Sequence, residues 1–218
     1  VWYGRMLQAI LHGHLDEDEL RSFLVRERIK GFKHGAREVD AVFSQLRRGL
    51  NVPLTTSTGR LLDAVACLLG ICYKRTYEGE GAMLLEAAAS RGRPGRISIE
   101  APVEERGRLL VLRTSEMVLQ AYLALRSGGR VEDIALAFLL SLAEGLAEMA
   151  LRAAEETGIR TVGFTGGVAY NDIITRALRT RLEAEGLRFL RHTELPCGDG
   201  GISVGQAAVA AVRAGLAS

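Results

Sequence analysis

The sequence predicts an α/β protein, because two segments of its second half each read as a strand that breaks at glycines and opens into a helix. These segments are residues 161–171, TVGFTGGVAYN, and residues 189–206, FLRHTELPCGDGGISVGQ. A third observation is the helical spacing of apolar residues before them, which predicts a large helical part. We expect residues 1–92 to be mainly helical, 93–114 to form a strand insertion and 115–218 to form the α/β part.

The N-terminal part contains charged, amphipathic segments, of which 15–29 and 36–46 are the clearest helices. The glycine-containing stretch 31–35 separates them. His12 and His14 lie two residues apart and do not share a helical face, so the spacing favours a surface or capping role over metal binding.

Residues 55–70, TTSTGRLLDAVACLLG, are predicted to form a helix that is capped by Ser57 or Thr58. The apolar stripe of this helix leaves Asp63 on another face. Asp63 either pairs with Arg60 or accepts hydrogen bonds from ribose hydroxyls, and the segment alone favours the pair.

The middle of the chain changes its pattern twice. Residues 77–89, YEGEGAMLLEAAA, form a glycine turn that enters another helix, with Glu80 and Glu86 available as hydrogen-bond acceptors. Residues 93–114 then become rich in proline, glycine and alternating residues. The runs RISIE and RLLVLRT are expected to be the two strands of a hairpin around 104–107.

Two helices are predicted between this hairpin and the first glycine corner. The first covers residues 114–126 and ends at Gly128 and Gly129. The second covers residues 131–157, has one apolar face and stops at Gly158.

The first glycine corner is expected to bind phosphate. Val162 and Phe164 supply the strand, and Gly166 and Gly167 remove the side chains that would keep a polyphosphate from the backbone. The helix that runs from Asn171 would begin with unsatisfied amides of positive partial charge. The alternative for a lone glycine pair is a tight turn without a ligand.

The second glycine corner adds a carboxylate. Its strand ends near Pro196, Asp199 stands among glycines, and a helix of small residues follows. Asp199 either caps that helix or reaches a metal ion, and this corner alone favours the cap. Two such corners can face each other across a nucleotide, because open α/β sheets bind ligands at the carboxyl ends of their strands.

The composition points away from nucleic-acid and membrane partners. The chain has 218 residues, of which 28 are basic and 26 are acidic. The resulting formal net charge of +2 does not indicate a nucleic-acid-binding surface. No apolar run reaches the roughly 18 uncharged residues of a membrane span, and the chain begins without a secretory leader. A cytoplasmic protein is expected. Because Val1 is not a methionine and the chain starts in mid-pattern, part of a longer protein is expected to precede it.

The three cysteines do not predict a disulfide framework or a paired zinc motif. Cys67 and Cys72 are expected to be small core residues of one helix. Cys197 stands near Asp199 in the second corner, and the neighbouring carboxylate disfavours its thiolate. A nucleophilic role for Cys197 is therefore not expected.

The order of elements resembles one lobe of an actin-like or sugar-kinase-like ATPase fold, with a ribonuclease-H-like sheet and a large helical part. The segments GRLLDAVACLLG, YEGEGAMLLE, GFTGGVAYN and PCGDGGISVGQA resemble the closing lobe of the hydrogenase-maturation carbamoyltransferases of HypF type. Their relatives include the universal tRNA threonylcarbamoyladenosine synthase component of TsaD type. The opening WYGRMLQAIL is similar to the start of that lobe, so residues 1–218 are expected to form it, with the preceding lobe absent.

The resemblance implies an activity and its partners. It implies ATP or carbamoyl adenylate and one divalent metal ion, which would be zinc, iron or magnesium, held between two lobes. The carbamoyl group would pass to the C-terminal cysteine of a HypE-type partner and later become the cyanide ligand of nickel-iron hydrogenase. No residue of this chain is expected to be catalytic, and the isolated chain is expected to be inactive.

The resemblance also implies site roles by position. Asp63 would meet the ribose, Asp199 would ligate the metal, and the remaining nucleotide contacts would come from Gly79, Glu80, Gly166, Gly167 and Asn171. The chain departs from the family pattern at Leu84, where a glutamate near the ribose is usual, and at Gly198, where an asparagine is frequent. The two metal-binding histidines of the family belong to the preceding lobe, and this chain has no matching motif.

Other functions remain open at this point. The departures favour a non-catalytic nucleotide-binding or interaction lobe. Within the enzyme class the alternatives are a tRNA threonylcarbamoyl transferase and a small-molecule O-carbamoyltransferase. The motifs TSTGRLLDA and DGGISVGQ are closer to the hydrogenase-maturation branch.

Overall fold

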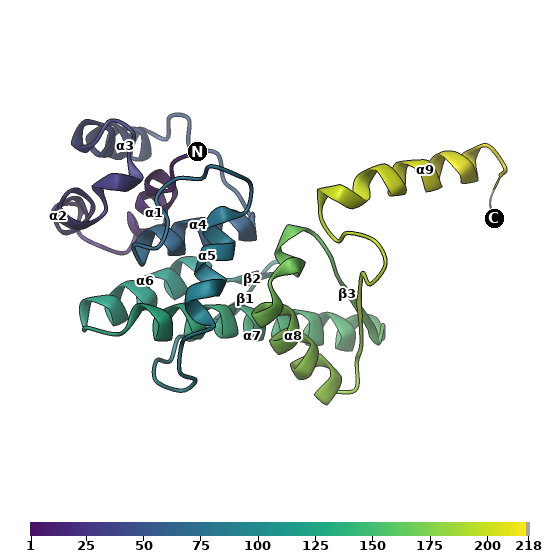
Figure 1. The fold of residues 1–218 in the computed structure, drawn as a ribbon. Helices are drawn as coiled ribbons and strands as arrows, with labels where there is room; N and C mark the ends of the chain where they lie inside the picture. The colour runs from purple at the N-terminus through teal and green to yellow at the C-terminus, as the bar shows by residue number, and fades with distance from the viewer. Residues whose placement is uncertain (217–218) are drawn as a thin grey trace.

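The computed structural model describes residues 1–216 and combines a helical body with two small sheets (Figure 1). Short 3-10 helices, labelled η, connect several elements. In chain order the elements are α1 (Gly4–Leu11), α2 (Glu17–Glu27), η1 (Ile29–Gly31), α3 (Ala36–Arg48), α4 (Thr58–Leu68), α5 (Glu80–Ala89), β1 (Val103–Arg106), β2 (Leu109–Leu112), α6 (Thr114–Arg126), α7 (Val131–Thr157), β3 (Thr161–Phe164), η2 (Gly167–Tyr170), α8 (Asp172–Ala184), β4 (Arg188–Arg191), η3 (Asp199–Gly201) and α9 (Ile202–Arg213).

Local capping explains where the N-terminal helices begin and end. Asp16 accepts hydrogen bonds from the amides of Asp18 and Glu19, and this cap starts α2 two residues later than the predicted segment. Gly49 ends α3 in the left-handed conformation. Ser57, rather than Thr58, caps α4 by accepting from the amide of Arg60 at 3.4 Å.

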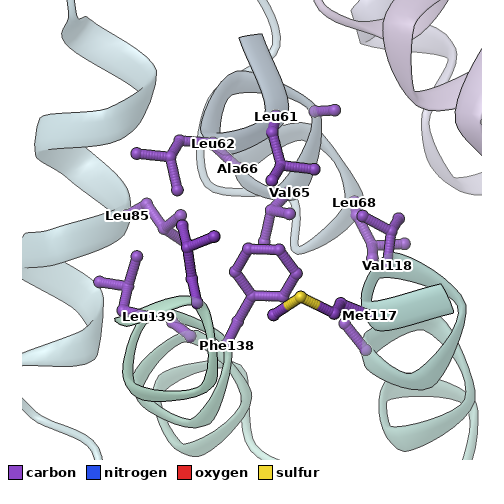
Figure 2. Close-up of a cluster of buried hydrophobic side chains, with 14 of the residues drawn as sticks. Leu61, Leu62, Val65, Ala66, Leu68, Leu85, Met117, Val118, Phe138 and Leu139 are labelled. Atoms are coloured by element: carbon purple, nitrogen blue, oxygen red, sulfur yellow. The ribbon is translucent and has the colours of Figure 1, made fainter. Parts of the chain in front are cut away.

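Helix α7 is the centre of the core. It packs against α5, α6 and α8 and against the β1–β2 hairpin. Figure 2 shows the ring of Phe138 from α7 among side chains of three other helices, including Val65 of α4, Leu85 of α5 and Met117 of α6. All four side chains are fully buried. The positions of α5 and α8, which bear the site described below, are therefore set by their common contact with α7.

Core burial also explains the unusual hydropathy of α7. By length and composition alone, this helix of 27 residues is long and apolar enough to span a membrane, with a mean hydropathy of 1.8 in its most apolar window. Half of that window is buried inside the fold. Its apolar residues thus have packing partners within the described part of the chain.

The hairpin differs from the sequence prediction in its first strand. Strand β1 pairs antiparallel with β2, with Arg106 opposite Leu109, and Gly107 makes the turn with φ of +63°. RISIE is not a strand, because helices bind its backbone. The carbonyl of Ile99 accepts from Ser141, and the amide of Glu100 donates to Gln120. The two partner residues lie 20 and 42 positions away in sequence, so no local pattern could indicate these contacts.

The two glycine corners follow the strands of a second, parallel sheet. Strand β3 pairs with β4 in the register Thr161 to Arg188 through Phe164 to Arg191, and α8 connects them. The α/β class is confirmed, and residues 1–216 hold two separate two-stranded sheets rather than one larger sheet. The likeness to an actin-like lobe stays a prediction.

Helix α9 reaches away from the body of the molecule (Figure 1). It buries no side chain within the described residues. Val209 and Val212 are more than half exposed, at 53% and 57%. The C-terminal helix thus exists as predicted but presents apolar surface that the rest of residues 1–216 does not cover.

Both N-terminal cysteines are buried, as expected, but they do not share a helix. Cys67 lies in α4, whereas Cys72 follows the helix after a turn at Gly70, which has φ of +73°. The amide of Cys72 then bonds back to the carbonyl of Ala66 at 3.2 Å. The prediction of one continuous helix was wrong because the glycine ends it.

We predict that Phe138→Ala lowers the free energy of unfolding by about 3–5 kcal/mol, because it leaves a cavity among four helices. Leu123→Ala on α6, where the side chain is 50% exposed, is the matched control and should cost about 1 kcal/mol or less. Urea denaturation of the 218-residue chain measures both. Equal losses would contradict the central place of Phe138.

Candidate functional site

The loops that follow β3 and β4 touch each other. The amide of Gly166 donates to the carbonyl of Cys197 at 2.7 Å, and the Thr165 hydroxyl donates to the same carbonyl at 3.2 Å. The amide of Gly198 donates to the Tyr170 hydroxyl at 3.3 Å. The two corners therefore meet at the carboxyl ends of two parallel strands, and that they face each other across a nucleotide stays a prediction.

The glycine pair of the first corner has open space around it. Gly166 has φ of +95° and ψ of 173°, a conformation that essentially only glycine adopts. Gly167 does not have a positive φ, and a Cβ atom on either residue would meet nothing within 4 Å. Neighbouring protein atoms therefore leave space for a ligand beside these two residues, although the Gly166 amide itself is bonded to the Cys197 carbonyl.

The first amides of α8 are not free, contrary to the sequence prediction. Glu86 Oε1 accepts from the amide of Asp172 at 2.6 Å and from that of Ile173 at 3.3 Å. Asn171 Oδ1 accepts from the amide of Ile174 at 2.9 Å. The prediction was wrong because Glu86, which comes from α5, is too distant in sequence for helix periodicity to reveal. One oxygen of the Glu86 carboxylate is therefore already occupied.

Asn171 is a helix cap with one donor left over. Its side chain is 95% buried, since the residue is only 5% exposed. While Oδ1 caps α8, the buried Nδ2 has no hydrogen-bond partner among the described residues. Such an unsatisfied amide costs free energy unless a partner is supplied. This nitrogen is therefore a spare donor buried at the first corner.

Asp63 lies beside Tyr3 and over Gly81. A Cβ atom on Gly81 would stand 2.6 Å from Asp63 Oδ1 and 2.8 Å from Tyr3 Cε2, so only glycine fits there. Asp63 forms no ion pair with Arg60 among residues 1–216, and the pairing that the segment favoured is not made. The Tyr3 hydroxyl is buried beside this carboxylate.

The environment of Asp63 disfavours its charged form. Burial raises the pKa of this carboxyl above its ordinary value of 3.8, while the Tyr3 hydroxyl and the positive charges of Arg75 and Arg60 act in the opposite direction. Burial and the charge of Asp63 in turn raise the pKa of Tyr3. Asp63 is thus a partly buried carboxylate without an ion-pair partner in residues 1–216, which is typical of functional sites.

Gly79 and Glu80 form the entry to α5. Gly79 is the N-cap residue with φ of +79°, and the Glu80 carboxylate accepts from the amide and hydroxyl of Thr76 at 2.5 and 3.0 Å. The amide of Thr76 lowers the pKa of Glu80. Glu80 therefore closes the turn before α5, and Leu84 lies one turn later with 38% of its surface exposed. Because α4 contacts both α5 and η2, the Asp63 edge and the glycine corner belong to neighbouring elements.

Asp199 is exposed at the first position of η3. Helix α9 has Gly201 as its N-cap residue and no side-chain cap, so the capping role that the corner alone favoured is not seen. No group of three or more His, Cys, Asp or Glu side chains in residues 1–216 is placed to hold a metal ion. A metal site that used Asp199 would need further ligands, such as water, a bound phosphate or side chains outside residues 1–216.

Sequence reasoning missed three polar side chains at the converging loops. His192 Nε2 lies 3.1 Å from the hydroxyl of Thr165, and Tyr170 holds the second loop through Gly198. A lone histidine gives no spacing signal. The signal that was available is positional, because Thr165 and His192 each directly follow a strand of the parallel pair.

The family of the chain follows from comparison with known proteins. Residues 3–206 match the sequence model of a family described as carbamoyltransferase, Kae1-like domain, second subdomain. The chain belongs to this carbamoyltransferase family. It is 40% identical over 202 residues to a probable carbamoyltransferase HypF from Methanocaldococcus jannaschii, covering 93% of this chain and 25% of the relative. It is 34% identical over 230 residues to the carbamoyltransferase HypF2 of Cupriavidus necator, covering 96% and 27%.

Solved structures agree with this assignment. The crystal structure of a HypF from T. kodakarensis matches with a TM-score of 0.84 and 38% identity, over 97% of this chain and 27% of that chain. A full-length HypF in a phosphate- and nucleotide-bound form matches with a TM-score of 0.81 and 26% identity, over 95% and 26%. A tRNA N6-adenosine threonylcarbamoyltransferase from Thermotoga neapolitana is 27% identical over 164 residues, 75% of this chain and 48% of the relative. The resemblance found in the motifs is confirmed, and the chain spans about a quarter of the HypF proteins it matches.

We predict different costs for two neighbouring glycine substitutions. Gly166→Ala should lower the free energy of unfolding by about 1–3 kcal/mol, because its backbone conformation is strained for any side chain. Gly167→Ala should change it by less than about 0.5 kcal/mol, because its Cβ atom meets open space. Thermal denaturation of both variants measures the difference, and a larger loss for Gly167→Ala would contradict the described corner.

We predict that Asp63→Asn raises the melting temperature at pH 7, because it removes a charge that burial disfavours. The folded pKa of Asp63 lies above the unfolded one, so the protonated carboxyl favours folding at low pH and this contribution is lost as the pH rises through the folded pKa. The advantage of the variant should therefore shrink as the pH falls toward 3.8. Melting curves at pH 7 and pH 4 measure it, and an advantage independent of pH would contradict the assignment.

Proposed function

We propose that this chain is the closing, nucleotide-binding lobe of a carbamoyltransferase that uses ATP or carbamoyl adenylate. The observation that carries the proposal is the contact between the loops bearing Gly166 and Asp199, through the bond from the Gly166 amide to the Cys197 carbonyl. The glycine corner proposed for phosphate and the corner that carries the Asp199 carboxylate then lie side by side at the ends of β3 and β4.

In the proposed complex, the phosphates lie against Gly166 and Gly167, where no side chain intervenes. The buried amide of Asn171 offers a further donor at the same corner. A related full-length HypF has been solved with phosphate and nucleotide bound, which supports a nucleotide for this lobe.

The nucleoside lies against the start of α5 in the same proposal. Ribose hydroxyls are donors, and the Asp63 carboxylate, without an ion-pair partner, is a matching acceptor. Gly79 and Glu80 border this edge. The contact between α4 and η2 keeps the nucleoside edge near the phosphate corner.

Asp199 supplies one ligand to a divalent metal ion, and the remaining ligands come from the part of the protein that precedes this lobe. A bound divalent cation polarises an acyl oxygen and neutralises phosphate charge. The chain's own contribution is to hold the nucleotide in place, which is the larger part of catalysis when the donor is already activated.

The acceptor in this proposal is the C-terminal cysteine of a HypE-type partner in the maturation of nickel-iron hydrogenase. Its sulfur forms a bond to the carbamoyl carbon, the bond from that carbon to the adenylate phosphate oxygen breaks, and the thiol proton leaves to solvent. None of these steps needs a nucleophile from this chain. The identities of 40% and 34% to HypF proteins support this branch of the family.

A tRNA threonylcarbamoyl transfer is the second candidate function. The 27% identity to the Thermotoga neapolitana enzyme, over 48% of its length, favours it. Assaying the complete natural protein with a HypE-type peptide and with tRNA separates the two candidates. Transfer to neither acceptor would support a non-catalytic lobe.

We predict that the isolated chain binds ATP more weakly than micromolar and turns over nothing. It spans about a quarter of its relatives, and α9 is left without packing partners in residues 1–216. Isothermal titration calorimetry with ATP and a divalent cation measures the affinity. Micromolar binding by this chain alone would show that the second lobe is dispensable for the nucleotide.

We predict that Asp199→Ala in the complete natural protein lowers carbamoyl transfer on the order of 10²-fold or more while leaving the melting temperature unchanged, because the side chain is exposed and ligates the metal. Glu194→Ala, which removes an exposed carboxylate from the same loop, is the matched control and should retain transfer. Unimpaired transfer by Asp199→Ala would remove this residue from the metal site.

A further inference from the structure

The Glu86 carboxylate joins two parts of the chain that are 86 residues apart in sequence. It leaves α5 and reaches the first turn of α8, where Oε1 accepts from the amides of Asp172 and Ile173. Asn171 satisfies the next amide of that turn. Three amides at this helix N-terminus are therefore held by side chains of the chain itself.

This contact decides where a phosphate can bind. The N-terminus of a helix favours an anion through its amides and its dipole, and Glu86 already fills that position at α8. The exposed Asp172 carboxylate also lies in this turn, where it pairs with Arg176 at 2.7 Å. A ligand phosphate is therefore directed away from α8 and toward the open space beside Gly166 and Gly167.

The same contact links the two edges of the proposed nucleotide site. Helix α5 begins at Glu80, beside the nucleoside edge, and Gly81 in its first turn supports Asp63. Glu86 lies six residues along this rigid helix, about 9 Å away at the rise of an α-helix. Its carboxylate holds the start of α8, which directly follows the phosphate corner.

We propose that Glu86 is a positioning residue that fixes the spacing between the nucleoside edge at Asp63 and the phosphate corner at Gly166. This inference rests on the proposed nucleotide function and assigns Glu86 no contact with the ligand. The length of the side chain matters, because the carboxylate must span from α5 to the amides of α8.

The test compares adenosine, which needs only the nucleoside edge, with ATP, which needs both edges. In the complete natural protein, Glu86→Ala should weaken ATP binding on the order of tenfold, as expected for the loss of charge-assisted hydrogen bonds, and leave adenosine binding within about twofold. Glu86→Asp should behave like Glu86→Ala, because its carboxylate is too short. Glu86→Gln should stay within about threefold of the wild type, because its amide oxygen still accepts.

Glu183→Ala is the matched control, since this glutamate lies on α8 and pairs with Arg179 at the exposed far end of the helix. It should bind both ligands as the wild type does. If Glu86 had a merely structural role, its substitution would weaken the binding of adenosine and of ATP to the same extent and would also lower the melting temperature. That parallel loss, or unchanged ATP binding in Glu86→Ala and Glu86→Asp, would overturn the inference.

The wild-type protein separates this inference from the proposed function. A wild type that binds neither ATP nor carbamoyl adenylate overturns both. A wild type that binds ATP, with Glu86 variants that bind it equally well, overturns the positioning role alone.

Discussion

The packing of α5 and α8 on one buried helix is the constraint on which the rest of the site depends. Both helices contact α7, whose side chains, including Phe138, fill the centre of the core. Their common support brings Glu86 of α5 to the amides of α8 and holds the phosphate corner next to the nucleoside edge. The site is thus a consequence of core packing, while its polar groups come from loops at strand and helix ends.

Several polar groups of the site are buried at a cost in folding free energy that the fold by itself does not explain. Among the described residues, Asp63 is a partly buried carboxylate without an ion pair, the buried Tyr3 hydroxyl lies beside it, and Asn171 Nδ2 is buried without a partner. Buried polar groups are normally satisfied, and exceptions mark places where a ligand or another part of the protein completes the network. All three residues lie on or beside the elements that the nucleotide proposal uses.

Sequence alone could predict those parts of the fold that local interactions determine. The cap at Ser57, the long apolar helix α7 and the strand that precedes Gly166 follow from caps, spacing and glycine chemistry within a few residues. The family resemblance correctly identified the carbamoyltransferase family. The predictions for RISIE and for the first amides of α8 failed because of contacts that are distant in sequence. RISIE is held by Gln120 and Ser141, and the amides of α8 are held by Glu86, so no pattern along the chain could show that they are occupied.

The most direct test of the central claim is a crystal structure of the complete natural protein with a non-hydrolysable ATP analogue and a divalent cation. We expect the phosphates to lie against Gly166 and Gly167 and the ribose to lie at Asp63. We also expect Glu86 to remain bound to the amides of Asp172 and Ile173. A triphosphate seated away from the converging loops, or on the first turn of α8 in place of Glu86, would contradict the central claim.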